Sequence, residues 1–280
     1  MISIVVPACN EGRVIERCLE GLLRDAAPNE IEIVVVCNGC TDETAERARR
    51  FGSPVKVVET PIGSKIHALN LGDKEVTSFP RFYVDADIEL TMAAVRDVAA
   101  LLDDHSPTVV AAPRAVVEYR GRPWMVRSFY RVWTRMPYFR KDMTGSGVFA
   151  FSRRGRERFG EFPDVITDDE FDRRMAAPSE RRASAHTTFT IHAPRTVEGL
   201  VKILSRSRAG RYELHERFPA LQDVAETGAW STFLTLVTTP SLWIHAPAYL
   251  AITLLTVRRA RQKMRQKTNR FWDRDESSRQ

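Results

Sequence analysis

RFYVDADI (Arg81–Ile88) is the stretch that decides the fold of this 280-residue chain. Its apolar run predicts a short buried strand that stops in two carboxylates separated by one residue. Side chains at positions i and i+2 of a strand point to the same side. Asp85 and Asp87 can therefore converge on one divalent cation, or on a cation and a sugar hydroxyl. Two anions this close repel each other unless a positive charge lies between them. The alternative is an ordinary Asp-rich turn after a strand.

The residues before this stretch alternate between strand and helix patterns. Apolar runs lie at 2–7, 31–36 and 55–59, and helical patterns lie at 14–23, 43–51 and 64–73. Continuous apolar runs are typical of parallel strands buried on both faces. The order predicts an α/β fold, a mainly parallel sheet with helices on both faces. Ligands bind such sheets beyond the carboxyl ends of the strands, where Asn10-Glu11, Asn38–Asp42 and Asp85–Asp87 fall.

The middle of the chain has a mixed pattern. Residues 109–112, 148–151 and 187–191 read as further strands, and a helical aromatic segment covers 124–138. Residues 173–182 predict a loop or a helix end. Thr196–Tyr212 predicts a basic helix that is broken or ends near Gly210.

Charge is concentrated at the C-terminal end of the chain. The net charge is +6, and residues 258–280 carry nine Arg or Lys against three Asp or Glu. The rest of the chain is therefore close to neutral. This distribution argues against a nucleic-acid-binding core and favours a basic arm that faces an anionic surface.

The cysteines and the N-terminus bear on the compartment. Cys9, Cys18, Cys37 and Cys40 all lie in the first forty residues. Cys37-x-x-Cys40 has redox or half-zinc-site spacing, but no second Cys/His pair follows nearby, so small buried thiols in a reducing cytoplasm are favoured. Met1 leads directly into an apolar run with no basic region before it, so no signal peptide is expected and the catalytic part is placed in the cytoplasm.

Residues 232–257 form an apolar segment with six threonines, Pro240, Pro247 and His245. Its length would suffice to cross a membrane, which takes about twenty apolar residues. A single span would place the basic tail outside, against the positive-inside tendency. We expect an interfacial helix or a shallow re-entrant pair, with the tail on anionic headgroups at the inner face of the cell membrane. The alternative is a pair of amphipathic helices that cover the sheet or form a dimer.

Six short motifs follow one another along residues 1–215. They are Val5–Glu11 with Pro7-x-x-Asn10-Glu11, Val36–Thr44, Gly63–Asn70, Asp85-x-Asp87, Gly145–Phe149 and Thr167–Asp169. Together they resemble the motifs of the family 2 glycosyltransferases, which have the GT-A fold and are mostly inverting. The resemblance implies a GT-A domain over 1–215, with a nucleotide-sugar half at 1–100 and an acceptor half at 101–215. An apolar helical segment (216–257) and a basic tail (258–280) follow.

The resemblance also implies a role for individual residues. Asp87 would ligate Mn²⁺ or Mg²⁺, and Asp85 would share that metal or contact the ribose. The acceptor hydroxyl loses its proton to a carboxylate base, for which Asp169 is the first candidate and Asp168 the second. Lys65 would lie near a phosphate or the base. The remaining donor-binding candidates are Pro7, Asn10, Glu11, Asn38 and Asp42, with Arg206 and Arg208 as a diphosphate clamp; His192 is a candidate third metal ligand.

Two departures from the family pattern affect specificity. Where the family usually has Asp-Asp-Gly-Ser, this chain has Cys37-Asn38-Gly39-Cys40. An Asn amide can accept or donate a hydrogen bond, so UDP is favoured as the donor nucleotide while GDP and TDP stay open. Ser205–Ala209 keeps arginines but lacks the Gln and Trp of processive members, which predicts transfer of one sugar per encounter. These arginines could equally form a solvated basic helix face.

The sequence thus predicts a metal-dependent, inverting glycosyltransferase that uses a nucleotide-diphosphate sugar and a hydroxyl acceptor. A lipid-linked or cell-envelope acceptor fits the C-terminal segment. A soluble small-molecule acceptor and a non-catalytic nucleotide-sugar-binding scaffold are the alternatives. The sugar, the acceptor and the oligomeric state are left open.

Overall fold

The structure, a computed structural model, describes residues 1–140, 146–221 and 229–265. These residues form two compact units. The first consists of 1–116, 146–164 and 168–190, and the second of 117–140, 165–167, 191–221 and 229–265. Gly145 and residues 266–280 of the predicted basic tail lie outside the described residues.

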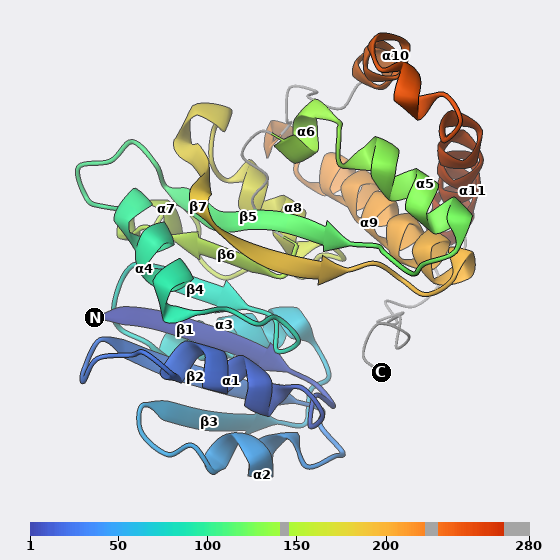
Figure 1. The fold of residues 1–280 in the computed structure, drawn as a ribbon. Helices are drawn as coiled ribbons and strands as arrows, with labels where there is room; N and C mark the ends of the chain where they lie inside the picture. Colours follow the sequence, from blue (N-terminus) through green and yellow to red (C-terminus); the bar gives the residue numbers. More distant parts are fainter. Residues whose placement is uncertain (141–145, 222–228, 266–280) are drawn as a thin grey trace. The chain divides into compact units, whose positions relative to one another are not determined.

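One sheet has the strand order β3-β2-β1-β4-β6-β5-β7 (Figure 1). Its parallel part consists of β1, which pairs with β2 and β4, and of β3, which pairs with β2. β6 runs antiparallel to both β4 and β5. The predicted α/β fold with a mainly parallel sheet is confirmed. The strands are β1 (Ile2–Ala8), β2 (Ile31–Asn38), β3 (Val55–Thr60), β4 (Arg81–Val84), β5 (Val110–Glu118), β6 (Val148–Phe151) and β7 (Arg181–His192).

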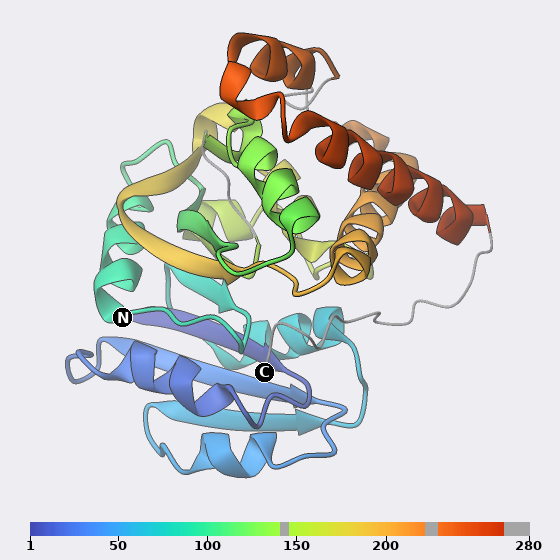
Figure 2. The same cartoon turned by 45° about the vertical axis from the view of Figure 1, so that its right-hand side comes forward.

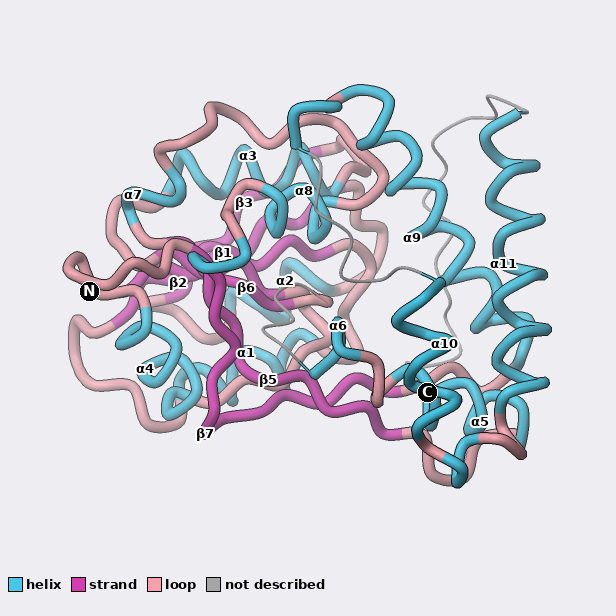
Figure 3. Tube along the Cα trace, turned by 90° about the horizontal axis from the view of Figure 1, so that it is seen from above, coloured by secondary structure: helices cyan, strands magenta, loops and turns pink. Residues whose placement is uncertain are grey.

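Helices of the first unit lie on both faces of this sheet. Figure 3 shows α3 and α8 on one side of the strands and α1 and α4 on the other. The strand order reverses at β1, whose two neighbours are β2 and β4, and such a switch point is where α/β sheets bind ligands. The helices of this unit are α1 (Ile15–Leu23), α2 (Thr44–Arg49), α3 (Lys65–Glu75), α4 (Met92–Leu101), α7 (Arg153–Arg156), α8 (Asp168–Arg174) and the 3₁₀ helix η1 (Pro178–Glu180).

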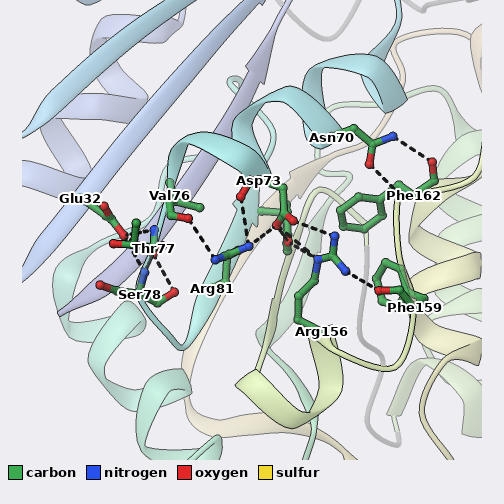
Figure 4. A network of polar contacts seen from close by, with 12 residues as sticks. Glu32, Asn70, Asp73, Val76, Thr77, Ser78, Arg81, Arg156, Phe159 and Phe162 are labelled. Atoms are coloured by element: carbon green, nitrogen blue, oxygen red, sulfur yellow. Dashed lines mark hydrogen bonds and ion pairs between the residues drawn. The ribbon is translucent and has the colours of Figure 1, made fainter.

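A buried polar network fastens α3 to β4 and α7 (Figure 4). The Asp73 carboxylate accepts hydrogen bonds from Arg81 Nη1 at 2.6 Å, from Arg156 Nη2 at 2.7 Å and from the Tyr83 hydroxyl. Burial alone would raise the pKa of Asp73, but these hydrogen bonds outweigh it and hold the pKa below its ordinary value. Asp73 is therefore an anion that fixes three elements.

Asn70, one turn earlier on α3, holds the loop that precedes α8. Its Nδ2 donates to the carbonyl oxygen of Phe162 at 3.0 Å, and its Oδ1 accepts from the N–H of the same residue at 2.7 Å (Figure 4). Both polar groups of one backbone position are thus satisfied by one side chain. The rigid α3 helix therefore sets where the segment leading to α8 begins.

The second unit is largely helical. Its α5, α9 and α11 pack together around buried apolar side chains that include Val126, Leu200 and Ile252 (Figure 2). None of the helices in the described ranges is long and apolar enough to cross a membrane. The elements are α5 (Trp124–Trp133), α6 (Pro137–Arg140), α9 (Val197–Arg217), η2 (Pro219–Leu221), α10 (Ala229–Thr238), η3 (Pro240–Leu242) and α11 (Ala246–Arg265).

One helix of this unit differs from expectation. The prediction that the basic helix is broken or ends near Gly210 is wrong, because α9 continues to Arg217. Gly210 serves close packing instead. A Cβ atom at this position would lie 2.4 Å from Thr167 Oγ1, so only glycine lets α9 approach this residue so closely.

Candidate active site

The loops that follow β1 and β2 are tied together by hydrogen bonds. Asn10 adopts a left-handed backbone with φ 54°, and its Oδ1 accepts from the N–H of Thr41 at 2.8 Å. The N–H of Gly12 donates to Asp42 Oδ2 at 3.0 Å. Glu11, between these two positions, is 5% exposed. The structure thus brings together Asn10, Glu11 and Asp42, three residues that the sequence singled out for donor binding.

Asn38 lies at the end of β2 and is fully buried. Its Nδ2 donates to the carbonyl oxygen of Ala8 at 2.9 Å, whereas its Oδ1 has no hydrogen-bond partner among the described residues. Asn38 Oδ1 is therefore a buried hydrogen-bond acceptor without a donor, at the carboxyl end of β2. Pro7 is buried within β1, where it pairs with Val36 of β2.

Lys65 joins the two acidic motifs. It is the first residue of α3, and its Nζ lies 2.7 Å from Asp85 Oδ1 and 2.7 Å from Asp168 Oδ2. Burial lowers the pKa of Lys65, but Asp168 and then Asp85 raise it, so the pKa stays well above the ordinary value and the ammonium is charged. The Lys65 ammonium therefore links the end of β4 to the start of α8.

Sequence reasoning missed the contact between Lys65 and Asp168. It placed this lysine near a phosphate or the nucleobase and did not connect it with the other acidic motif. A signal was present, because a lysine at the first position of a helix opposes the helix dipole. Such a residue needs a compensating anion, which the structure supplies twice.

The carboxylates of Asp85 and Asp87 follow β4 as predicted. Burial raises the pKa of Asp85; the Lys65 ammonium opposes this rise and the Asp87 charge adds to it. The N–H of Asp85 donates to the carbonyl oxygen of Gly147 at 2.7 Å, which links the pair to the glycine-containing segment before β6. Among the described residues, no group of three or more His, Cys, Asp or Glu side chains is arranged to hold a metal.

Asp169 is a partly buried carboxyl group in the first turn of α8. Its Oδ2 accepts from the N–H of Ser146 at 3.1 Å, and its Oδ1 has no hydrogen-bond partner among the described residues. Burial and the neighbouring Asp168 raise the pKa of Asp169 to about 7, although Lys65 acts in the opposite direction. A carboxylate with this pKa can take up a proton near neutral pH. Asp168 and Asp169 also begin α8, where the helix dipole favours anions.

Asp172 is a second buried carboxyl group, which sequence reasoning missed. It is 1% exposed, and neither of its carboxyl oxygens has a hydrogen-bond partner among the described residues. Burial, followed by the charges of Asp168 and Asp169, raises the pKa of Asp172 well above its ordinary value. The available signal was spacing, because Asp168 and Asp172 stand four residues apart on one face of α8.

Three candidate residues lie in the second unit. Arg206 and Arg208 are on α9, and the exposed His192 ends β7. Their roles as diphosphate clamp and metal ligand stay predictions.

Comparison with curated proteins finds two glycosyltransferases of Staphylococcus aureus. A 4,4′-diaponeurosporenoate glycosyltransferase (strain USA300) is 25% identical over 255 residues, which are 87% of this chain and 65% of that protein. The poly(ribitol-phosphate) β-N-acetylglucosaminyltransferase TarS (strain Mu50) is 27% identical over 126 residues, 43% of this chain and 22% of that protein. The chain thus spans less than two thirds of the length of either relative.

Solved structures show the same fold. The mannosyltransferase PcManGT from Pyrobaculum calidifontis, in complex with GDP-Man and Mn²⁺, superposes with a TM-score of 0.67 at 19% identity, covering 96% of this chain and 88% of that one. Glucosyl-3-phosphoglycerate synthase from Mycobacterium tuberculosis, in complex with Mn²⁺ and UDP-glucose, gives 0.55 at 19% identity, covering 80% of each chain. The family model for glycosyl transferase family 2 matches residues 3–156. The chain therefore belongs to glycosyl transferase family 2.

Proposed function

We propose that the protein transfers a single sugar from a nucleotide-diphosphate sugar to a hydroxyl acceptor, with inversion at the sugar C1. One observation carries the proposal. The Lys65 ammonium joins Asp85 of the first acidic motif to Asp168 of the second, at 2.7 Å from each. Asp169, the next residue, is a partly buried carboxyl group with a pKa of about 7. The donor-side and acceptor-side chemistry of a sugar transfer thus share one cluster.

Each part of this cluster has a task in the reaction. Asp169 Oδ1 is free to accept the proton of the acceptor hydroxyl, while Ser146 holds Oδ2. The hydroxyl oxygen then attacks C1 from the face opposite the diphosphate, which gives inversion. The tied loops that carry Asn10, Glu11 and Asp42 bind the nucleoside. The two ion pairs of Lys65 hold the segment that carries the catalytic base, Asp169, close to the end of β4.

A divalent cation fits the residues after β4. Asp85 and Asp87 offer carboxylate oxygens, the donor type that Mg²⁺ and Mn²⁺ prefer. Mg²⁺ is commonly bound by one or two carboxylates together with substrate phosphates, so these two residues would suffice with a donor diphosphate. When bound, the cation would neutralise the charge that develops on the leaving diphosphate.

UDP is the donor nucleotide that we propose. The unsatisfied Oδ1 of Asn38 is an acceptor that suits the N3–H of uracil. Because Asn38 is fully buried, contact with the base requires a local rearrangement on binding. A nucleotide panel that includes GDP and TDP tests this assignment.

We further propose that the C-terminal helices rest on an anionic membrane, where a lipid-linked acceptor is presented. The final turns of α11 are rich in basic residues, among them Arg258, Arg259, Arg261 and Lys263, which complement anionic headgroups. Eight large apolar side chains of α10, α11 and the turn between η3 and α11 are exposed: Phe233, Leu234, Val237, Trp243, Ile244, Leu250, Leu254 and Leu255.

Vesicle binding tests the membrane proposal. Ile244 and Leu254 are 67% and 70% exposed, so their replacement by Ser should leave the fold intact. We expect the double variant to lose most of its co-sedimentation with vesicles that contain phosphatidylglycerol. Ile62→Ser, at a residue that is 52% exposed in the first unit, is the control. Equal sedimentation of all three proteins would instead favour a soluble acceptor.

Activity measurements test the catalytic proposal. Release of UDP from UDP-sugars should be at least a hundredfold slower in Asp169→Asn than in the wild type, since a general base contributes roughly 10²–10⁴-fold. Asp104→Asn, at an exposed site, should leave the rate unchanged. Full activity of Asp169→Asn would refute the base, and a wild type inactive with every nucleotide sugar would favour a binding scaffold.

A further inference from the structure

Two cysteine side chains meet at the carboxyl end of β2. Cys37 is 1% exposed, Cys40 is partly exposed, and their side chains are joined by a hydrogen bond. Both are free thiols. The pair occupies the motif that carries Asn38, in which family members usually have acidic and hydroxyl side chains. The proposed reaction gives neither sulfur a task.

The Cys40 sulfur also takes part in the contact between the two donor-binding loops. Its Sγ accepts from the N–H of Asn10 at 3.4 Å and, in the thiol form, donates to the carbonyl oxygen of Ala8 at 3.4 Å. These residues flank the end of β1, and Asn10 returns a hydrogen bond to Thr41. A change in the bonding of this sulfur therefore reaches both loops at once.

The two thiols differ in reactivity. The hydrogen bond from Cys37 lowers the pKa of Cys40 to about 6; burial opposes this change, and the N–H of Asn10 supports it. The same hydrogen bond and burial raise the pKa of Cys37. At neutral pH, Cys40 is thus a partly exposed thiolate beside a protonated partner, an arrangement that makes a cysteine nucleophilic.

We propose that Cys37 and Cys40 form a reversible dithiol–disulfide pair whose oxidation weakens donor binding, a regulation that rests on the proposed function. The oxidant is a small-molecule disulfide. The Cys40 thiolate attacks one of its sulfurs, forming a mixed disulfide and releasing one thiolate. The Cys37 thiol then loses its proton to water and attacks the Cys40 sulfur, which forms the internal disulfide and releases the second thiolate. Two protein thiols are oxidised, and one disulfide is reduced to two thiols.

The consequence for donor binding follows from the contacts that the disulfide would disturb. The bond draws the Cys40 sulfur toward Cys37 and away from the N–H of Asn10. Asn38 lies within the closed ring, so its Oδ1 is reoriented as well. Nucleotide binding and oxidation of the pair are thermodynamically linked. If the disulfide weakens nucleotide binding, a bound nucleotide must in turn make the pair harder to oxidise. A tenfold preference corresponds to a rise of about 30 mV in the reduction potential of the pair.

Mass spectrometry tests the chemistry directly. Cys37 and Cys40 lie in a single tryptic peptide, residues 25–47, whereas Cys9 and Cys18 lie in others. After equilibration with oxidised glutathione and alkylation of the remaining thiols, peptide 25–47 should be two hydrogens lighter and unalkylated. Dithiothreitol should restore both alkylation sites. Persistence of two alkylated cysteines in this peptide after oxidation would overturn the proposal.

Nucleotide binding tests the regulation. We expect Kd for UDP with Mn²⁺ to rise at least tenfold on oxidation of the wild type and to be insensitive to oxidant in Cys40→Ser, which lacks the attacking thiolate. The Cys9→Ser protein should respond as the wild type does. An unchanged Kd in the disulfide form would overturn the regulation. Absence of UDP binding in the reduced wild type would refute the proposed donor instead, and the regulation with it, while the peptide result would still report on the disulfide.

Discussion

Lys65→Met removes the ammonium that lies between Asp85 and Asp168. Both ion pairs are 2.7 Å long, and the side chains of Lys65 and Asp168 are 17% and 12% exposed. Breaking a buried pair by removing one partner costs roughly 3–5 kcal/mol. The Asp85 side chain is 35% exposed, so solvent screens part of that pair. We therefore expect a loss near the lower limit, about 3 kcal/mol of unfolding free energy at pH 8.

Urea unfolding of a double-mutant cycle measures this loss. The proteins are the wild type, Lys65→Met, Asp168→Asn and the double variant, and contacting charges should show a coupling energy of about 1–3 kcal/mol. Lys56→Met is the matched control, because Lys56 pairs with Glu75 at the surface and such pairs contribute about 0–1 kcal/mol. If the single changes add within about 0.5 kcal/mol, Lys65 does not join the two motifs.

Further predictions concern the base, the loop before it and one glycine. Because the pKa of Asp169 is raised to about 7 and only its carboxylate accepts a proton, kcat/KM should fall as pH decreases through about 7; a profile flat between pH 5.5 and 8.5 would contradict this role. Asn70→Ala leaves a backbone N–H and C=O unpaired, which should lower the unfolding free energy by about 1–3 kcal/mol in urea. Gly210→Ala places a Cβ 2.4 Å from Thr167 Oγ1 and should lower the unfolding free energy by about 1–3 kcal/mol. Gly160→Ala, where the added Cβ would meet open space, is the control and should lower it less. Equal Tm values for the two glycine variants would refute the packing argument.

The parallel half of the fold could be predicted because its signals are local. Continuous apolar runs marked β1, β2 and β3 to within two residues at either end, and Ser64 caps α3 through a hydrogen bond from the N–H of His67. The strand RFYV after them matches β4. The predicted end of a helix at Gly210 was wrong because a glycine required by tertiary packing and one that ends a helix look alike in sequence.

The positions of the candidate residues in the fold could be predicted motif by motif, but the contacts between the motifs could not. The positions of Asp85 after a strand and of Asp169 at a helix start could be predicted from their short patterns, since strand ends and helix starts are local features. The cation that joins the two motifs, the raised pKa of Asp169 and the buried Asp172 depend on residues separated by tens to about a hundred positions along the chain. Burial and Coulomb interactions of this kind exist only once the chain has folded.

Thermal unfolding with nucleotides tests the central claim, donor binding at the end of β4, most directly. A ligand at one hundred times its Kd stabilises the folded state by about 2.7 kcal/mol, which is a Tm rise of roughly 5–10 °C for a chain of this size. We predict such a rise with UDP and Mn²⁺ and a much smaller one in Asp87→Asn. No rise with any nucleoside diphosphate, or an equal rise in Asp87→Asn, would contradict the account.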